Sequence, residues 1–124
     1  SIEPPVETAM RPEVFNGEHV FDAELVAKAF DVSIAAVAAA IGKPADSVRR
    51  RKSAVSLQDG LGRLGRIYSD LCALHADDRD AVLRWLITPN RALDERARPR
   101  TLLAGAQLGV LEALVDAMKR RQPL

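Results

Sequence analysis

Apolar residues recur at spacings of three and four positions along most of this chain, which is the period of an amphipathic helix. Glycine and proline interrupt the pattern at several points, so it predicts several short helices. Aromatic residues are only 4% of the composition, whereas strands are enriched in aromatic and β-branched side chains. The sequence therefore predicts an all-α fold of about six helices, in one domain or in two small subdomains that share a core.

The pattern divides the chain into three regions. Residues 1–20 contain several prolines, show little periodicity and are predicted to form a flexible arm. In residues 21–56, Asp22 and Ser33 are suited to cap two helices, and a third helix is expected from Ala45 or Asp46 to about Lys52. Residues 57–124 are predicted to form a second helical region.

The longest expected helix runs from Ser56 or Asp59 to about Leu74. It contains three glycines, each of which weakens a helix by up to ~1 kcal/mol relative to alanine. Tolerance of these glycines predicts close packing against a neighbouring helix or a subunit partner. The three positions are Gly60, Gly62 and Gly65.

Residues 33–48 fit the helix-turn-helix template. The small Ala38 stands where two helices would cross, Gly42 lies in the turn, and Val48 would anchor the second helix in the core. The N-terminal part of such a second helix enters the major groove of DNA. The alternative is an ordinary helical hairpin with a solvated basic face. The residues predicted to contact DNA are Ser47, Arg49, Arg50, Arg51 and Lys52.

The distribution of charge supports an anion-binding face. The net charge is only +1, but residues 1–32 carry seven acidic residues against two basic ones. Residues 49–66 carry six basic residues against the single acid Asp59. Such asymmetry predicts one face that attracts anions, for which duplex DNA is a candidate, beside an acidic segment.

Nothing in the sequence indicates catalysis. His19 and His75 are the only histidines, and the aspartates that follow His75 are better explained as the first turn of a helix. Neither a nucleophile elbow nor a glycine-rich phosphate loop is present. Cys72 is the sole cysteine, which leaves no disulfide or cysteine-based metal site. We therefore expect no enzyme activity, no metal and no cofactor.

The sequence also indicates where the chain acts. No apolar run approaches the ~20 residues that a membrane span requires. Acidic residues and prolines occupy the N-terminus, where a signal peptide has a basic and then an apolar stretch. We expect a cytoplasmic protein with no membrane partner.

A Trp-Leu-x-x-Pro-Asn-x-x-Leu motif follows in the second half of the chain. Trp85 and Leu86 belong to an expected helix that begins after Asp77 or Asp78 and that Pro89 ends. A basic link and Pro99 then lead to one last amphipathic helix. Taken alone, Trp85 is a core aromatic and Pro89-Asn90 a helix stop. The motif residues are Trp85, Leu86, Pro89, Asn90 and Leu93.

Together these features resemble the toxin-binding domain of the Xre/MbcA/ParS antitoxin family, and MbcA-like antitoxins in particular. The resemblance covers about residues 25–120, with a degenerate helix-turn-helix ahead of the toxin-binding domain in residues 57–124. Gly109 and Val110 fall near the position where the family has a glycine or polar residue before a valine. Arg51 replaces the usual aromatic of the recognition helix, which is a departure from the family pattern.

The resemblance implies an antitoxin that binds a RES-domain, NAD-consuming toxin, blocks its active site within an oligomeric complex and represses its own operon by binding operator DNA. The alternative is a stand-alone helix-turn-helix regulator that dimerises through its second half, and a third is an adaptor that anchors another protein. The residues predicted to contact the toxin are Trp85, Pro89, Asn90, Leu111, Leu114, Met118, Lys119, Arg120, Arg121, Gln122, Pro123 and Leu124.

The last six residues allow two interpretations. A cationic tail can enter a toxin pocket that has to accommodate the pyrophosphate of NAD. The same charges also suit the C-terminal end of a helix dipole, followed by fraying. Both interpretations of Lys119–Leu124 stay open at this point.

Overall fold

The computed structural model describes residues 9–104 and 107–121, and these residues form seven α-helices and no strand. The all-α prediction is confirmed, with one helix more than the expected number. One isolated antiparallel bridge joins Phe15 to Phe21. The helices are α1 (Ala23–Phe30), α2 (Ile34–Ala40), α3 (Ala45–Arg50), α4 (Gln58–Leu74), α5 (Arg79–Ile87), α6 (Thr101–Ala104) and α7 (Leu108–Arg121). Single turns of 3₁₀-helix lie at Pro12–Val14, Val55–Leu57 and Asp94–Arg96.

The predicted caps begin three of these helices. The carboxylate of Asp22 accepts hydrogen bonds from the first turn of α1, and the hydroxyl of Ser33 accepts one from the Ala36 N–H. Asp78 caps α5 through a hydrogen bond from the Ala81 N–H at 3.3 Å. Each side chain satisfies a backbone donor that has no partner inside its helix. These short polar residues therefore set the first turns of α1, α2 and α5.

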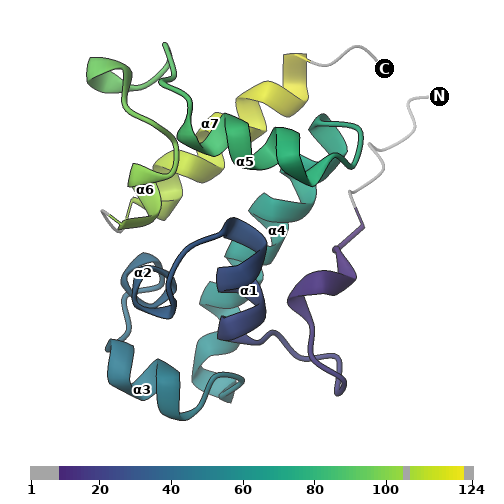
Figure 1. Cartoon of the computed structure of the whole chain (residues 1–124), viewed down its shortest axis with the longest axis vertical. Helices are drawn as coiled ribbons and strands as arrows, with labels where there is room; N and C mark the ends of the chain where they lie inside the picture. The colour runs from purple at the N-terminus through teal and green to yellow at the C-terminus, as the bar shows by residue number, and fades with distance from the viewer. Residues whose placement is uncertain (1–8, 105–106, 122–124) are drawn as a thin grey trace, which may run out of the picture.

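Helix α4 is the central element of the fold. It runs along the molecule, with α1, α2 and α3 around its first half and α5 beside its second half (Figure 1). Helix α7 packs along α4 and is paired with it at Arg63 and at Asp70. The buried apolar side chains form one continuous cluster that includes Val26 of α1, Leu64 of α4 and Leu111 of α7. Helices α2 and α6 pack directly against each other. The predicted boundary at residues 56 and 57 therefore marks a connection within one core and does not separate two cores.

The N-terminal segment is packed where the sequence predicted a flexible arm. Val14 is completely buried, and the rings of Phe15 and Phe21 stack at 4.6 Å between centroids. The backbone N–H of Arg11 donates to the Ser69 hydroxyl of α4 at 2.8 Å. The prediction is therefore wrong for residues 10–20, because Met10, Val14 and Phe15 of this segment pack into the core beside α4. Residues 1–8 of the predicted arm lie outside the described residues.

The last predicted helix is divided in two. Helix α6 ends at Ala104 and α7 begins at Leu108, and the Gln107 N–H donates to the Leu102 carbonyl at 2.9 Å. Leu102, Leu103 and Leu108 are all buried. Helical spacing continues across the break because both helices present apolar residues to the same core, so the periodicity alone did not reveal it.

The glycines of α4 lie against residues of the same chain. A Cβ at Gly60 would stand 2.7 Å from the Cβ of Ile41, and one at Gly65 would stand 3.0 Å from the Phe21 ring. Gly62 also faces Phe21, at 3.2 Å. The prediction of close packing is confirmed, and the neighbours are the end of α2 and the N-terminal segment.

Substitution of Gly60 by alanine should destabilise the fold. The new methyl would overlap the Cβ of Ile41, which is attached to the backbone and cannot rotate away. We expect a loss of about 1–3 kcal/mol from overpacking, which exceeds the gain of ~1 kcal/mol in helix propensity. Urea unfolding measures the difference. Gly109→Ala is the control, since a Cβ there meets nothing within 4 Å, and equal stability changes for the two variants would contradict the packing argument.

The only tyrosine of the chain is a core residue. Tyr68 is 2% exposed, and its ring meets Phe30 edge-on at 5.7 Å between centroids. Burial raises the pKa of Tyr68 to about 12, and a hydrogen bond with Cys72 contributes to this increase. Burial also raises the pKa of the Cys72 thiol, which keeps it protonated and unreactive.

Alkaline pH should destabilise the protein through Tyr68. The unfolded phenol releases its proton near its ordinary pKa of 10.0, whereas the folded one keeps it to about 12. The unfolded state therefore loses protons first, and the free energy of unfolding falls as the pH rises between these values. Absorbance titration of the tyrosinate should give a midpoint near 12. Tyr68→Phe should lose this part of the pH dependence, and a midpoint near 10 in the folded protein would contradict the burial argument.

Candidate functional site

Helices α2 and α3 form a compact pair joined by a tight turn. Ala38 of α2 and Val48 of α3 are 1% and 0% exposed, so both face the core. Gly42 adopts a φ of +71°, a backbone conformation that residues other than glycine rarely adopt. The Lys43 N–H closes the turn by donating to the Ala38 carbonyl at 2.9 Å. The buried Ala38 and Val48 and the positive φ of Gly42 therefore hold α2 and α3 together as a tight helical pair.

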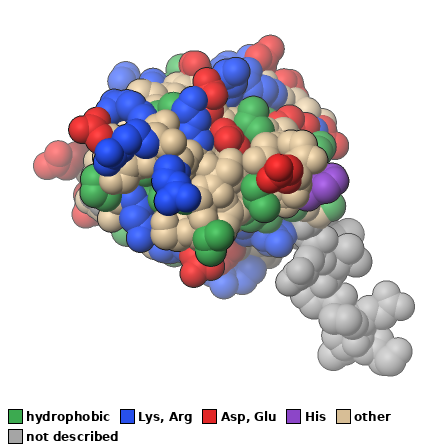
Figure 2. All heavy atoms as spheres, turned by 90° about the horizontal axis from the view of Figure 1, so that it is seen from below, with side chains coloured by type: hydrophobic (Ala, Val, Ile, Leu, Met, Phe, Trp, Pro, Cys, Tyr) green, Lys and Arg blue, Asp and Glu red, His purple; other side chains and the backbone are tan. Residues whose placement is uncertain are grey.

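Burial of Val48 determines which side chains of α3 point outward. Ser47, Arg49, Arg50 and Arg51 are all exposed, and Lys and Arg side chains gather on the end of the molecule seen from below in Figure 2. The structure thus brings four of the five predicted DNA contacts to one solvent-facing surface. We call Ser47, Arg49, Arg50 and Arg51 the α3 face.

The charges of the α3 face are partly engaged within the chain. Arg49 pairs with the Asp46 carboxylate at 3.0 Å, and the Nε of Arg50 donates to the Asp46 carbonyl at 3.4 Å. Lys52 is half-buried, and its ammonium pairs with Glu24 of α1 at 3.2 Å. Lys52 therefore ties the end of α3 to α1, whereas the exposed pair of Arg49 contributes little and breaks easily.

Trp85 and Asn90, two of the predicted toxin contacts, have structural roles. Trp85 is half-buried against the core, with its ring 6.4 Å from that of His75. The side-chain oxygen of Asn90 accepts a hydrogen bond from the Ala92 N–H at 2.9 Å, and the Asn90 N–H donates to Ala97 at 3.0 Å. Asn90 therefore shapes the turn after α5, while the neighbouring Pro89 is exposed.

Leu111 cannot be a contact for another protein. It is 0% exposed and belongs to the core together with Leu108 and Val115 of the same helix. This corrects the prediction that Leu111 meets the toxin. Periodicity identified the apolar positions of α7 but did not say which of them α4 covers.

Lys119 is also held within the chain. Its ammonium lies 3.3 Å from Oδ1 of Asp70, a carboxylate of α4 whose side chain is 4% exposed. About two turns earlier, Glu112 of α7 pairs with Arg63 of α4. Lys119 is therefore engaged in an internal ion pair and does not extend toward a toxin pocket with the rest of the cationic tail. Arg120 and Arg121 are exposed and stay candidates for that contact. Gln122, Pro123 and Leu124 lie outside the described residues.

One flank of α7 stays accessible beside the face that packs on α4. Leu114 and Met118 are half-buried, and Arg121 is exposed. Val110, which sequence reasoning did not select, lies on the same flank and is 46% exposed. We call Val110, Leu114, Met118 and Arg121 the α7 flank. The sequence analysis selected Leu114, Met118 and Arg121 as toxin contacts, but the helical spacing of Val110 did not distinguish it from the buried residues of α7.

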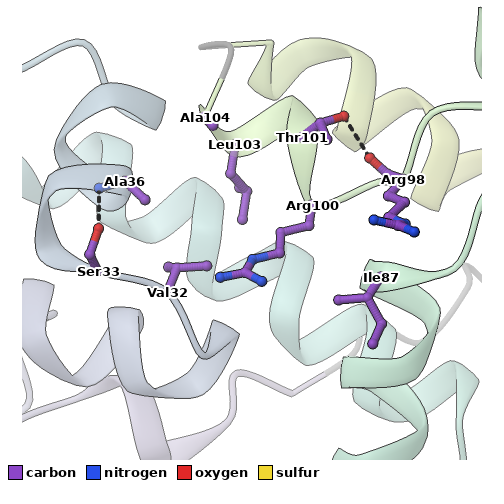
Figure 3. Close-up of a pocket in the computed structure, with 9 residues that line it drawn as sticks. All are labelled: Val32, Ser33, Ala36, Ile87, Arg98, Arg100, Thr101, Leu103 and Ala104. Carbon is purple, nitrogen blue, oxygen red and sulfur yellow. Dashed lines mark hydrogen bonds between the residues drawn. The ribbon is translucent and has the colours of Figure 1, made fainter.

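A groove between α2, α5 and α6 was not predicted from the sequence. It has a volume of about 470 Å³ and lies between the start of α2, the end of α5 and the segment that leads into α6 (Figure 3). Arg98 and Arg100 line it together with apolar side chains. The sequence showed a basic link at these arginines but not that the chain folds back to place them beside α2.

Two further findings concern metals and membranes. In residues 9–104 and 107–121, no three His, Cys, Asp or Glu side chains are grouped closely enough to hold a metal ion. Over the same ranges, no helix has the length and apolar character needed to cross a membrane.

No family model matches the chain, and no curated protein or solved structure matches it.

Proposed function

We propose that this chain is an antitoxin with two working surfaces. The α3 face binds operator DNA. The α7 flank, together with the turn after α5 at Pro89 and Asn90, binds a RES-domain, NAD-consuming toxin and blocks its active site. The observation that carries the DNA-binding half is the exposure of three consecutive arginines at the end of a short helix that Val48 anchors. The toxin-binding half rests on the family resemblance and on the accessible apolar flank.

The α3 face has the chemistry of a DNA reader. Arginine can donate two hydrogen bonds to a guanine edge in the major groove, and it also pairs with phosphates. Ser47 lies near the start of α3, the part of a recognition helix that approaches the bases. Arg49 would exchange its exposed pair with Asp46 for contacts to DNA, at a cost of about 0–1 kcal/mol.

Arg50→Ala should weaken DNA binding and leave the fold intact, because Arg50 is exposed at the end of α3. Loss of a base contact should reduce affinity for the operator by about 1–3 kcal/mol. Loss of a phosphate contact should reduce the slope of log K against log salt by ~0.9. Fluorescence anisotropy with a duplex from upstream of the gene measures both quantities. Arg91→Ala, which removes an exposed arginine of the turn after α5, is the matched control. Equal effects of the two substitutions would show that the chain binds DNA only by non-specific charge attraction and would contradict a role for the α3 face.

The toxin-binding half has a direct test in cells. Co-expression with a RES-domain toxin encoded beside the gene should restore growth and cellular NAD, and the two proteins should purify as one complex. Continued NAD loss despite a folded chain would contradict the antitoxin role.

The alternative of a stand-alone regulator assigns the α7 flank to a subunit interface. Val110 and Leu114 would then be covered by a second copy of the chain, which would place two α3 faces on one DNA duplex. Sedimentation of the chain without toxin distinguishes the two roles. A stable dimer that Leu114→Asp dissociates would favour the regulator.

A further inference from the structure

The groove shown in Figure 3 combines an apolar floor with a basic rim. Val32 lies just before α2, Ala36 lies in the first turn of α2, and Leu103 belongs to α6. Ile87, the last residue of α5, is 51% exposed at the rim. None of these residues belongs to the α3 face or to the α7 flank, so the groove is a third surface of the chain.

The floor of the groove is apolar. Val32, Ala36 and Leu103 also line a narrower apolar recess behind it, together with Phe30 and Leu64. This recess has no room for a water molecule. The floor is therefore a dry apolar surface, and an aliphatic side chain placed on it would remove apolar area from water. The floor therefore favours an aliphatic side chain over a polar one.

The rim carries positive charge with no acidic side chain among the lining residues. Arg98 and Arg100 both line the groove, and both are exposed. Arg100 donates to the backbone carbonyl of Asp31 at 3.2 Å, which fixes its guanidinium above the end of α1. Asp31 itself lines an adjacent hollow that shares Ile87 and Arg100 with the groove. A guanidinium has five N–H donors, so Arg100 can hold this carbonyl and an anion together.

We infer that this groove binds a short acidic and aliphatic segment of a partner protein. A leucine-type side chain rests on the half-buried Val32 and Ala36, and a neighbouring carboxylate pairs with Arg98 and Arg100. Charge complementarity selects this occupant, because a basic segment would be repelled by the rim. A nucleic acid would satisfy the two arginines but would leave the apolar floor and Ile87 in water. The inference stands apart from the proposed function, since neither operator DNA nor the α7 flank takes part in it.

The size of the groove sets the expected strength of binding. A volume of about 470 Å³ receives only a few side chains. The surface area that such a contact buries falls well short of the ~1,600 Å² of a stable protein interface. We therefore expect millimolar affinity for an isolated short peptide. In a full complex the groove would contribute one contact of a larger interface.

The probe is the peptide acetyl-Glu-Leu-Leu-Glu-amide, titrated into the ¹⁵N-labelled full chain and followed by NMR. Saturable shifts of the backbone amides near Val32–Ala36, Ile87 and residues 98–104, apart from Pro99, which lacks an N–H, are the expected result. Acetyl-Lys-Leu-Leu-Lys-amide tests the charge, and acetyl-Glu-Gly-Gly-Glu-amide tests the aliphatic side chains. Each should bind at least about tenfold more weakly. No saturable shifts with the first peptide, or equal shifts with all three, would overturn the inference.

Variants locate the binding site within the chain. Arg98→Gln should weaken binding of the first peptide about tenfold, whereas Arg91→Gln, which removes an exposed arginine outside the groove, should leave it unchanged. Ala36→Leu should block binding by filling the floor without any change of charge. Thermal melts of each variant verify the fold. If Arg98→Gln and Ala36→Leu both fold and bind normally, the groove is not the site.

Two further measurements separate this inference from the proposed function. Arg50→Ala should leave peptide binding unchanged, so a failure of DNA binding does not affect the result. A short DNA duplex that produces the same shifts at Val32–Ala36 and Ile87 would assign the groove to nucleic acid and overturn the inference.

Discussion

Leu111→Asp should abolish folding of this chain. Leu111 is 0% exposed in the core between α7 and α4, and the substitution removes its apolar contacts and buries a carboxylate without a partner. Truncation of a buried leucine to alanine alone costs about 2–5 kcal/mol. The buried charge adds several kcal/mol, and the sum is on the order of the whole stability of a small domain.

Circular dichroism and thermal unfolding measure this effect. We expect loss of most of the helical signal at 25 °C for Leu111→Asp and a lowered melting temperature for Leu111→Ala. A folded Leu111→Asp that had lost only toxin binding would restore Leu111 as a contact residue and would contradict the burial described above.

Leu114→Asp should have the opposite outcome, with the fold retained and the toxin no longer bound. Leu114 is half-buried on the α7 flank, where an added carboxylate stays in contact with water. A carboxylate that the interface buries without a partner costs on the order of 2 kcal/mol or more, so affinity should fall by about thirtyfold or more. Growth rescue during co-expression and calorimetric titration with purified toxin measure the loss.

Ala113→Asp is the matched control for this prediction. Ala113 is exposed on α7, and the substitution adds the same charge to the neighbouring position. Successive residues of a helix point about 100° apart, so this charge lies away from the α7 flank. Ala113→Asp should neutralise the toxin as the unmodified chain does. Equal loss in both variants would show that added negative charge, and not the α7 flank, explains the result.

Local sequence signals predicted the helix starts well because their causes are local. Asp22, Ser33 and Asp78 cap their helices through hydrogen bonds to residues two or three positions away. Gly42 takes a positive φ that its lack of a side chain allows. The same local reasoning predicted that Arg49, Arg50 and Arg51 face solvent, because Val48 is buried on the opposite side of α3.

Contacts between distant segments explain the predictions that were wrong. Residues 10–20 show no periodicity, yet Val14 is buried because the glycines of α4 leave room for the N-terminal segment. Leu111 and Leu114 are both leucines of one helix, and only the position of α4 determines that the first is core. Lys119 belongs to a basic run, but Asp70, far away in the sequence, holds it.

The sequence by itself determined the helical class, most helix boundaries and the basic character of α3, because spacing, caps and turn residues act over a few positions. Only the tertiary structure decided which apolar residues of α7 stay accessible, that one core crosses the expected domain boundary, and that Arg98 and Arg100 lie beside Val32 and Ala36. These features depend on which surfaces meet when the helices pack, and helical spacing carries no information about the partner that covers each face.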